Sequence, residues 1–163
     1  MTSSMSARTD GRSATGRTDV QKAAALVGIV FVAVGVLGFV PGITTNYSSL
    51  QFASHTSEAK LLGLFQVSVL HNVVHLLFGV AGLLLARTAL GARNFLLYGG
   101  LAYAVLFFYG ILIEYQSSAN VVPFDDADNA LHFALAVGML VLSFLLDRGP
   151  DWRDVVVEGK ASV

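Results

Sequence analysis

Two apolar segments of the chain begin with the same polar pair, an asparagine followed three positions later by a histidine. Asn72 with His75 and Asn129 with His132 align without gaps at an offset of 57 residues, from 72 to 129. Residues three or four apart share one face of a helix, so His71, Asn72 and His75 would project from the same side. Such side chains in an apolar helix hydrogen-bond to neighbouring helices or mark a functional site.

One chemistry that this pattern could support is the binding of a metal ion. Histidines four positions apart have a suitable spacing for zinc, iron or copper, and a carboxylate can complete such a site. The candidate metal ligands are His71, His75, His132 and Glu114.

Haem is a variant of the same hypothesis, with His75 and His132 as axial ligands from facing helices. Gly79 and Ala136, four positions after each histidine, would leave space for a flat ring. Small residues also occur wherever helices pack closely, so they do not by themselves indicate a cofactor.

A structural role for the polar residues needs no ligand. Hydrogen bonds from Asn72, Asn129 and the histidines to neighbouring helices would contribute about 1 kcal/mol each. Asp126 or Asp128 would cap the following helix, with negative charge at the positive end of its dipole. We predict such a polar layer, with no cofactor, and keep metal or haem as the alternative.

Four apolar blocks must position these side chains, and they cover about residues 23–40, 67–86, 95–113 and 130–146. A length of roughly 17–20 residues is enough to cross about 30 Å of hydrocarbon, where backbone groups must be paired within helices. We therefore predict an all-α, four-helix transmembrane bundle over residues 20–148. Residues 1–19 form a polar tail that we expect to be disordered, and residues 149–163 form a second tail.

The composition agrees with this class of protein. Hydrophobic residues make up 55% of the 163 residues and charged residues only 13%, against roughly 25% charged in soluble domains. The net charge is −1, which gives no sign of nucleic-acid binding. Cysteine is absent, so disulfides and thiol chemistry are excluded.

Basic residues predict the orientation in the membrane. Nine of the ten lysines and arginines fall on one side of a four-span topology, and Lys60 is the exception. The nine are Arg8, Arg12, Arg17, Lys22, Arg87, Arg93, Arg148, Arg153 and Lys160. Because positive charge is retained in the cytoplasm, both termini are predicted to be cytoplasmic and the polar layer to lie near the outer surface.

Two further expectations concern local structure. A short helix at the membrane surface is predicted over residues 58–66, with Thr56 or Ser57 as its cap. The match between the second and fourth blocks suggests two helical hairpins in a parallel repeat, although the first and third blocks show no comparable match.

The runs LLGLFQVSVLHNVVHLLFGVAGLLLAR and DNALHFALAVGML resemble a family of small, mainly actinobacterial membrane proteins, domain of unknown function 4383. The resemblance covers about residues 20–148. It implies a four-span protein of the bacterial cell membrane, and it implies no activity and no functional residues.

We therefore expect a non-enzymatic structural or accessory component of the bacterial plasma membrane. Its expected partners are the lipid bilayer and a second copy or another membrane protein, with no nucleic acid. The alternatives are the metal- or haem-binding protein described above and a small transporter or proton relay. The relay is disfavoured because the inner halves of the four apolar blocks carry no charged residue that could continue a path across the membrane.

Overall fold

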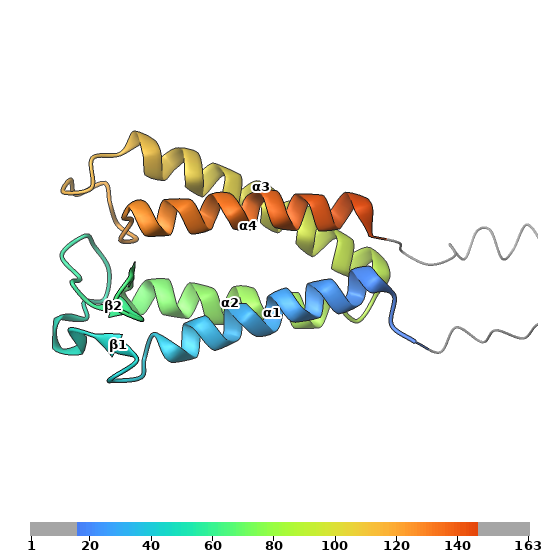
Figure 1. Cartoon of the computed structure of the whole chain (residues 1–163), viewed down its shortest axis with the longest axis horizontal. Coiled ribbons are helices and arrows are strands. Elements are labelled where there is room, and N and C mark those ends of the chain that lie inside the picture. The colour runs from blue at the N-terminus through green and yellow to red at the C-terminus, as the bar shows by residue number, and fades with distance from the viewer. Residues whose placement is uncertain (1–15, 147–163) are drawn as a thin grey trace, which may run out of the picture.

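A computed structural model describes residues 16–146 of the chain. Most of both predicted tails, including all of residues 149–163, lies outside the described residues. Four helices form the body of the protein: α1 Asp19–Leu37, α2 Val69–Leu85, α3 Ala89–Leu112 and α4 Asp126–Leu145. Figure 1 shows that α1 begins and α4 ends at the same end of the bundle. The predicted four-helix bundle is confirmed.

Three of these helices, α1, α3 and α4, are long and apolar enough to cross a membrane. The fourth, α2, is apolar but has only 17 residues, which is about 25 Å at 1.5 Å per residue. It nevertheless runs beside α1 for most of its length (Figure 1). The two residues that follow α2 are tied to the first turn of α1, because Gln21 Nε2 donates to the carbonyls of Ala86 (3.1 Å) and Arg87 (2.9 Å).

The helices are arranged as two antiparallel hairpins, α1 with α2 and α3 with α4. Glycines allow the close approach within the first hairpin. A Cβ atom on Gly79 would lie 2.6 Å from the backbone nitrogen of Val32 and 2.7 Å from the carbonyl oxygen of Gly28. The two hairpins pack on each other mainly through α1 and α3.

Side-chain caps set the start of three helices. Ser68, Thr88 and Asp125 accept hydrogen bonds from backbone N–H groups in the first turns of α2, α3 and α4, respectively. The predicted cap of α4 is therefore wrong, because Asp126 and Asp128 lie inside the first turn and the cap is Asp125. The sequence Asp125-Asp126-Ala127-Asp128 offers several cap positions, and only the backbone path selects one of them.

The end of the bundle opposite the start of α1 and the end of α4 carries two long connections, residues 38–68 and 113–125, which we call the cap. The first connection forms a small antiparallel sheet in the order β1-β2-β3, in which Thr44 pairs with Leu61 and Lys60 with Gln66. The strands are β1 Thr44–Thr45, β2 Lys60–Leu61 and β3 Phe65–Gln66, and a 3-10 turn, η1, covers Tyr47–Ser49.

The predicted surface helix over residues 58–66 is wrong, because this segment is the β2–β3 hairpin. Leu62 and Gly63 at its turn have φ values of 54° and 72°, in the left-handed region that an α-helix cannot include. Ser57, one of the two residues predicted as the N-cap of that helix, is buried, and its hydroxyl donates to the Val67 carbonyl. Pairing with β1, which is distant in sequence, stabilises the strand conformation here.

Candidate functional site

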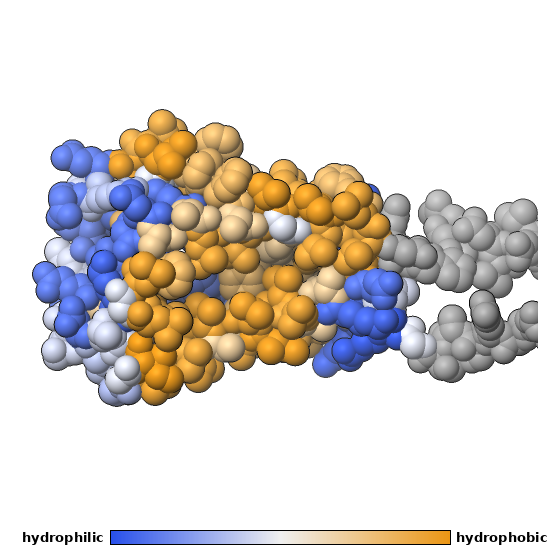
Figure 2. Space-filling model, viewed as in Figure 1, coloured by the Kyte–Doolittle hydropathy of each residue, from blue (hydrophilic) through white to orange (hydrophobic). Residues whose placement is uncertain are grey.

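The distribution of polar and apolar side chains is the reverse of that in a soluble domain. Large apolar side chains cover the outside of the helices, among them Leu26, Leu77, Val105 and Phe144, all well exposed. On the face that Figure 2 shows, an apolar belt covers the helices, with hydrophilic residues at one end and a small hydrophilic patch at the other. Polar side chains gather inside the bundle instead. This arrangement is typical of an integral membrane protein.

The predicted polar residues of α2 and α4 are buried at the capped end of the bundle. His71, Asn72, His75, Asn129 and His132 are each 7% exposed or less. Because α2 and α4 both begin at the cap, the two Asn-x-x-His pairs enter the bundle at corresponding depths. The structure therefore brings these five residues to one level. Glu114, by contrast, is exposed just after the end of α3.

Aromatic rings connect the histidines in a continuous array across the bundle. The ring centroids of His71 and His75 lie 4.4 Å apart, and His75 stacks on Phe31 of α1 at 5.4 Å. Phe31 stacks on Tyr103 of α3 at 5.4 Å, and Tyr103 contacts His132 at 5.3 Å. Phe31 and Tyr103 therefore fill the space between the histidines of the two hairpins. Sequence reasoning did not assign these two residues to the layer.

Corresponding contacts recur in the two hairpins. Residues of α1 and α3 match at an offset of 72, from 28 to 100, 31 to 103 and 38 to 110, whereas α2 and α4 match at the offset of 57. The matched pairs of contacts are Gly28 on Leu83 and Gly100 on Leu140, Phe31 on His75 and Tyr103 on His132, and Gly38 on Asn72 and Gly110 on Asn129. The repeat therefore includes all four helices, and Gly-x-x-aromatic is the signal that identifies it in α1 and α3.

Most polar atoms of the layer lack a hydrogen-bond partner among the described residues. These atoms are Nδ1 of His71, His75 and His132, both terminal atoms of the Asn72 amide, and Oδ1 of Asn129. Asn129 Nδ2 has a partner, because it donates to the Tyr115 hydroxyl at 2.7 Å. The hydrogen bonds that we predicted for Asn72 are therefore not formed. Its amide packs against Gly38, and stacked rings hold the layer together instead.

The acidic residues at the start of α4 connect the layer to the cap. Asp128 is buried, and its Oδ2 accepts from the backbone nitrogen of Gln66 at 3.2 Å. Asp126 is exposed and accepts from the Tyr115 hydroxyl at 2.9 Å. Burial and this bond to a carboxylate raise the pKa of Tyr115. These bonds join the α3–α4 connection and β3 to α4.

The geometry bears on the two ligation hypotheses. Within residues 16–146, no group of three or more His, Asp or Glu side chains is placed so that it could hold a metal ion. For haem, the space beside Gly79 is occupied by the backbone of α1, and Phe31 and Tyr103 lie between His75 and His132 in the ring array. Gly79 therefore serves close helix packing in this arrangement.

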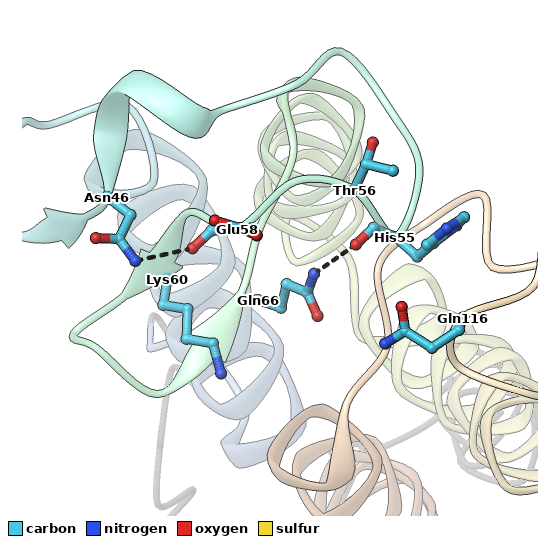
Figure 3. A pocket seen from close by; sticks show the side chains of 7 residues that line it. All are labelled: Asn46, His55, Thr56, Glu58, Lys60, Gln66 and Gln116. Atoms are coloured by element: carbon cyan, nitrogen blue, oxygen red, sulfur yellow. Dashed lines mark hydrogen bonds between the residues drawn. The ribbon is translucent and has the colours of Figure 1, made fainter.

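The cap contains a cavity of about 500 Å³ that sequence reasoning did not find. It lies where the two long connections meet, and Figure 3 shows polar side chains from both. The lining residues are Asn46, His55, Thr56, Glu58, Lys60, Gln66 and Gln116. Their sequence positions are scattered over 70 residues, from 46 to 116, so no local motif marks them.

Comparison with known families identifies the chain. The family described as "Domain of unknown function (DUF4383)" matches residues 21–145, which is more than half of the chain. The chain belongs to this family. The matched range contains the whole cap and all four helices except the first two residues of α1. No curated protein and no solved structure matches the DUF4383 chain.

Proposed function

We propose that this DUF4383 protein is a four-span, non-enzymatic structural or accessory component of the bacterial cell membrane. The observation that carries the proposal is the reversed distribution of side chains, with histidines and asparagines buried inside and large apolar residues facing outward. Exposing such a belt to water would be strongly unfavourable, at about 25 cal/mol for each Å² of apolar surface. A bilayer removes that cost.

The length of α2 does not prevent it from being the fourth span. It begins directly after the cap, and the residues that follow it, Ala86 and Arg87, lie at the opposite end, where Gln21 of α1 binds their carbonyls. A helix about 5 Å shorter than the hydrocarbon thickness can be accommodated by local thinning of the bilayer at modest cost. The β2–β3 hairpin, which precedes α2, exposes the apolar side chains of Leu62 and Leu64 at the capped end of the bundle.

The proposed orientation has both termini in the cytoplasm and the cap outside. Among the described basic residues, Arg17, Lys22, Arg87 and Arg93 lie at the end opposite the cap, and Lys60 is in the cap. Retention of positive charge in the cytoplasm favours this orientation.

The proposed role of the polar layer is to join the two hairpins in a unique arrangement. The Phe31–Tyr103 stack lies at the interface of the hairpins, and each ring also contacts a histidine of its own hairpin. Aromatic pairs of this kind contribute about 0.5–1.5 kcal/mol beyond the area that they bury. Such a core would fix the register of α1 against α3 without any chemical reaction.

Metal binding is the second candidate, because three buried histidines have an Nδ1 atom without a partner. Buried polar groups are usually satisfied by a hydrogen bond or by metal coordination. A small rotation of His71 and His75, whose rings are already 4.4 Å apart, would be needed to converge on one ion. Glu114 would have to move from an exposed position to join them.

Elemental analysis of protein purified in mild detergent without chelators separates the two candidates. The structural role predicts well under one equivalent of zinc, iron or copper per chain, and His75→Phe and His132→Phe proteins that remain folded. Near one equivalent, lost in His75→Phe but kept in the control His55→Phe, would overturn the ligand-free role. His55 is a suitable control because it lies in the cap, outside the layer.

A further inference from the structure

The cap is placed close to the bilayer by its own packing. The β2–β3 hairpin packs on the last two turns of α1. The contacting side chains are Leu61 and Phe65 of the hairpin, Val67 directly after it, and Val34 and Leu37 of α1. A sheet that packs on a membrane-spanning helix at this height lies at the level of the lipid headgroups.

The turn of the same hairpin exposes two large apolar side chains. Leu62 is 68% exposed and Leu64 is 54% exposed, on either side of Gly63. Leu62 has a φ of 54°, in the left-handed region that is rare for a residue with a Cβ. Two exposed leucines at one turn of a polar cap are accounted for if the turn contacts the edge of the hydrocarbon region.

The cavity in the cap lies beside the β2–β3 hairpin, at the proposed level of the lipid headgroups. Lys60 lines the cavity, and its Nζ is 3.5 Å from the carboxylate of Asp125, the residue that caps α4. Gln66 also lines it, and its backbone binds Asp128 in the first turn of α4. The cavity therefore lies where α4 enters the proposed membrane, within reach of a lipid headgroup.

The lining carries one acidic and one basic side chain. Glu58 contributes a carboxylate and Lys60 an ammonium group, and the remaining lining residues other than His55 are uncharged amides and a hydroxyl (Figure 3). No aromatic side chain apart from the His55 imidazole is available for stacking on a sugar ring. The lining suits a small ligand that carries one positive and one negative group.

The lining offers hydrogen-bond acceptors for a positive group and hydrogen-bond donors for a negative group. Both donor hydrogens of the Gln66 amide are used by the carbonyls of His55 and Ser57, so its Oε1 remains as a second acceptor in the lining, besides the Glu58 carboxylate. These acceptors suit an ammonium group that has N–H donors. Lys60 and the Gln116 amide can donate to an anion, and Lys60 is half-exposed with only a long contact to Asp125.

We propose that this cavity binds the phosphoethanolamine head of an outer-leaflet phospholipid. The primary ammonium group is bound by Glu58 and Gln66, and the phosphate by Lys60 and Gln116. Because a choline head has no N–H donor and a glycerol head has no positive charge, the site discriminates against both. The inference rests on the proposed membrane location, which places the cavity among headgroups.

Lipid retention by the purified, full-length protein tests this directly. The protein in mild detergent is mixed with phosphatidylethanolamine, phosphatidylcholine or phosphatidylglycerol of identical acyl chains, and bound lipid is counted by native mass spectrometry. The expected result is at least about fivefold greater retention of phosphatidylethanolamine. The Glu58→Gln and Lys60→Gln variants should each lose this preference. The control Ser48→Ala, in the cap but outside the cavity, should keep it.

Equal retention of the three lipids, or an unchanged preference in Glu58→Gln, would overturn the proposal. Soluble glycerophosphoethanolamine is added as a competitor in a second arm. If it displaces the lipid at equal concentration, the site is one for a free zwitterion and the lipid assignment is wrong. Because binding is measured in detergent, a negative result leaves the membrane topology standing, and a reversed topology is detected separately.

Discussion

Replacement of Gly79 by alanine tests the packing within the first hairpin. The added Cβ would meet two backbone atoms of α1, the nitrogen of Val32 at 2.6 Å and the carbonyl oxygen of Gly28 at 2.7 Å. Backbone atoms cannot move aside as a flexible side chain can, so α1 and α2 would have to separate. Gly138 of α4 is the matched control, because a Cβ there would meet nothing within 4 Å.

The size of the effect follows from two opposing terms. Alanine is favoured over glycine inside a helix by about 1 kcal/mol, and this term applies to both variants. Overpacking costs about 1–3 kcal/mol, and it applies only to Gly79→Ala. The free energy of unfolding should therefore be about 1–3 kcal/mol lower in Gly79→Ala than in Gly138→Ala, which corresponds to a factor of roughly 5–150 in the folded-to-unfolded ratio.

Unfolding of the detergent-solubilised protein by sodium dodecyl sulfate, followed by circular dichroism, provides the measurement. Gly138→Ala should unfold at the same or a higher denaturant concentration than the parent, and Gly79→Ala at a clearly lower one. Equal stability of the two alanine variants would show that α1 and α2 are not in contact at Gly79, and the described hairpin would then be incorrect.

Two further substitutions can be followed in the same assay. Gln21→Leu removes both hydrogen bonds to the carbonyls of Ala86 and Arg87 and should lower the free energy of unfolding by about 1–3 kcal/mol, whereas an unchanged stability would mean that the ends of α1 and α2 are not joined. Asn72→Leu replaces a buried amide that has no partner by an apolar group of similar size, so stability should stay within about 1 kcal/mol of the parent or rise. A loss of 2 kcal/mol or more would reveal a bound ion or water at this amide.

The sequence predicted the helices well because an apolar block in a membrane has little choice of conformation. All four predicted spans contain a helix, with differences at the ends. The largest difference is in α3, which starts at Ala89 and not near residue 95, because Thr88 caps it and the polar residues Arg93 and Asn94 are part of its first turns. The first polar residues beside an apolar block indicate where the apolar segment ends, and the helix itself can continue beyond them.

The shared level of the histidines along the bundle was also predictable, since it needs only the direction of α2 and α4 and the position of each histidine in its helix. Their contacts were not, because the partners Phe31 and Tyr103 belong to other helices and look like ordinary apolar residues in the sequence. Glu114 illustrates the limit, because it lies only two residues beyond the end of α3 and its side chain is exposed, outside the layer. The β2–β3 hairpin and the cavity depend on pairing between distant loops, for which the sequence has no periodic signal.

The location of the cap on the outer side of a membrane is the claim on which the proposed function rests. The chain has no cysteine, so single cysteines can be introduced without background, at Ser48 in the cap and at Thr88 in the α2–α3 connection. A membrane-impermeant maleimide is applied to intact spheroplasts and, separately, to lysed ones. The account predicts that Ser48→Cys is labelled in intact spheroplasts and Thr88→Cys only after lysis. Labelling of both in intact spheroplasts, or of Thr88→Cys alone, would contradict it.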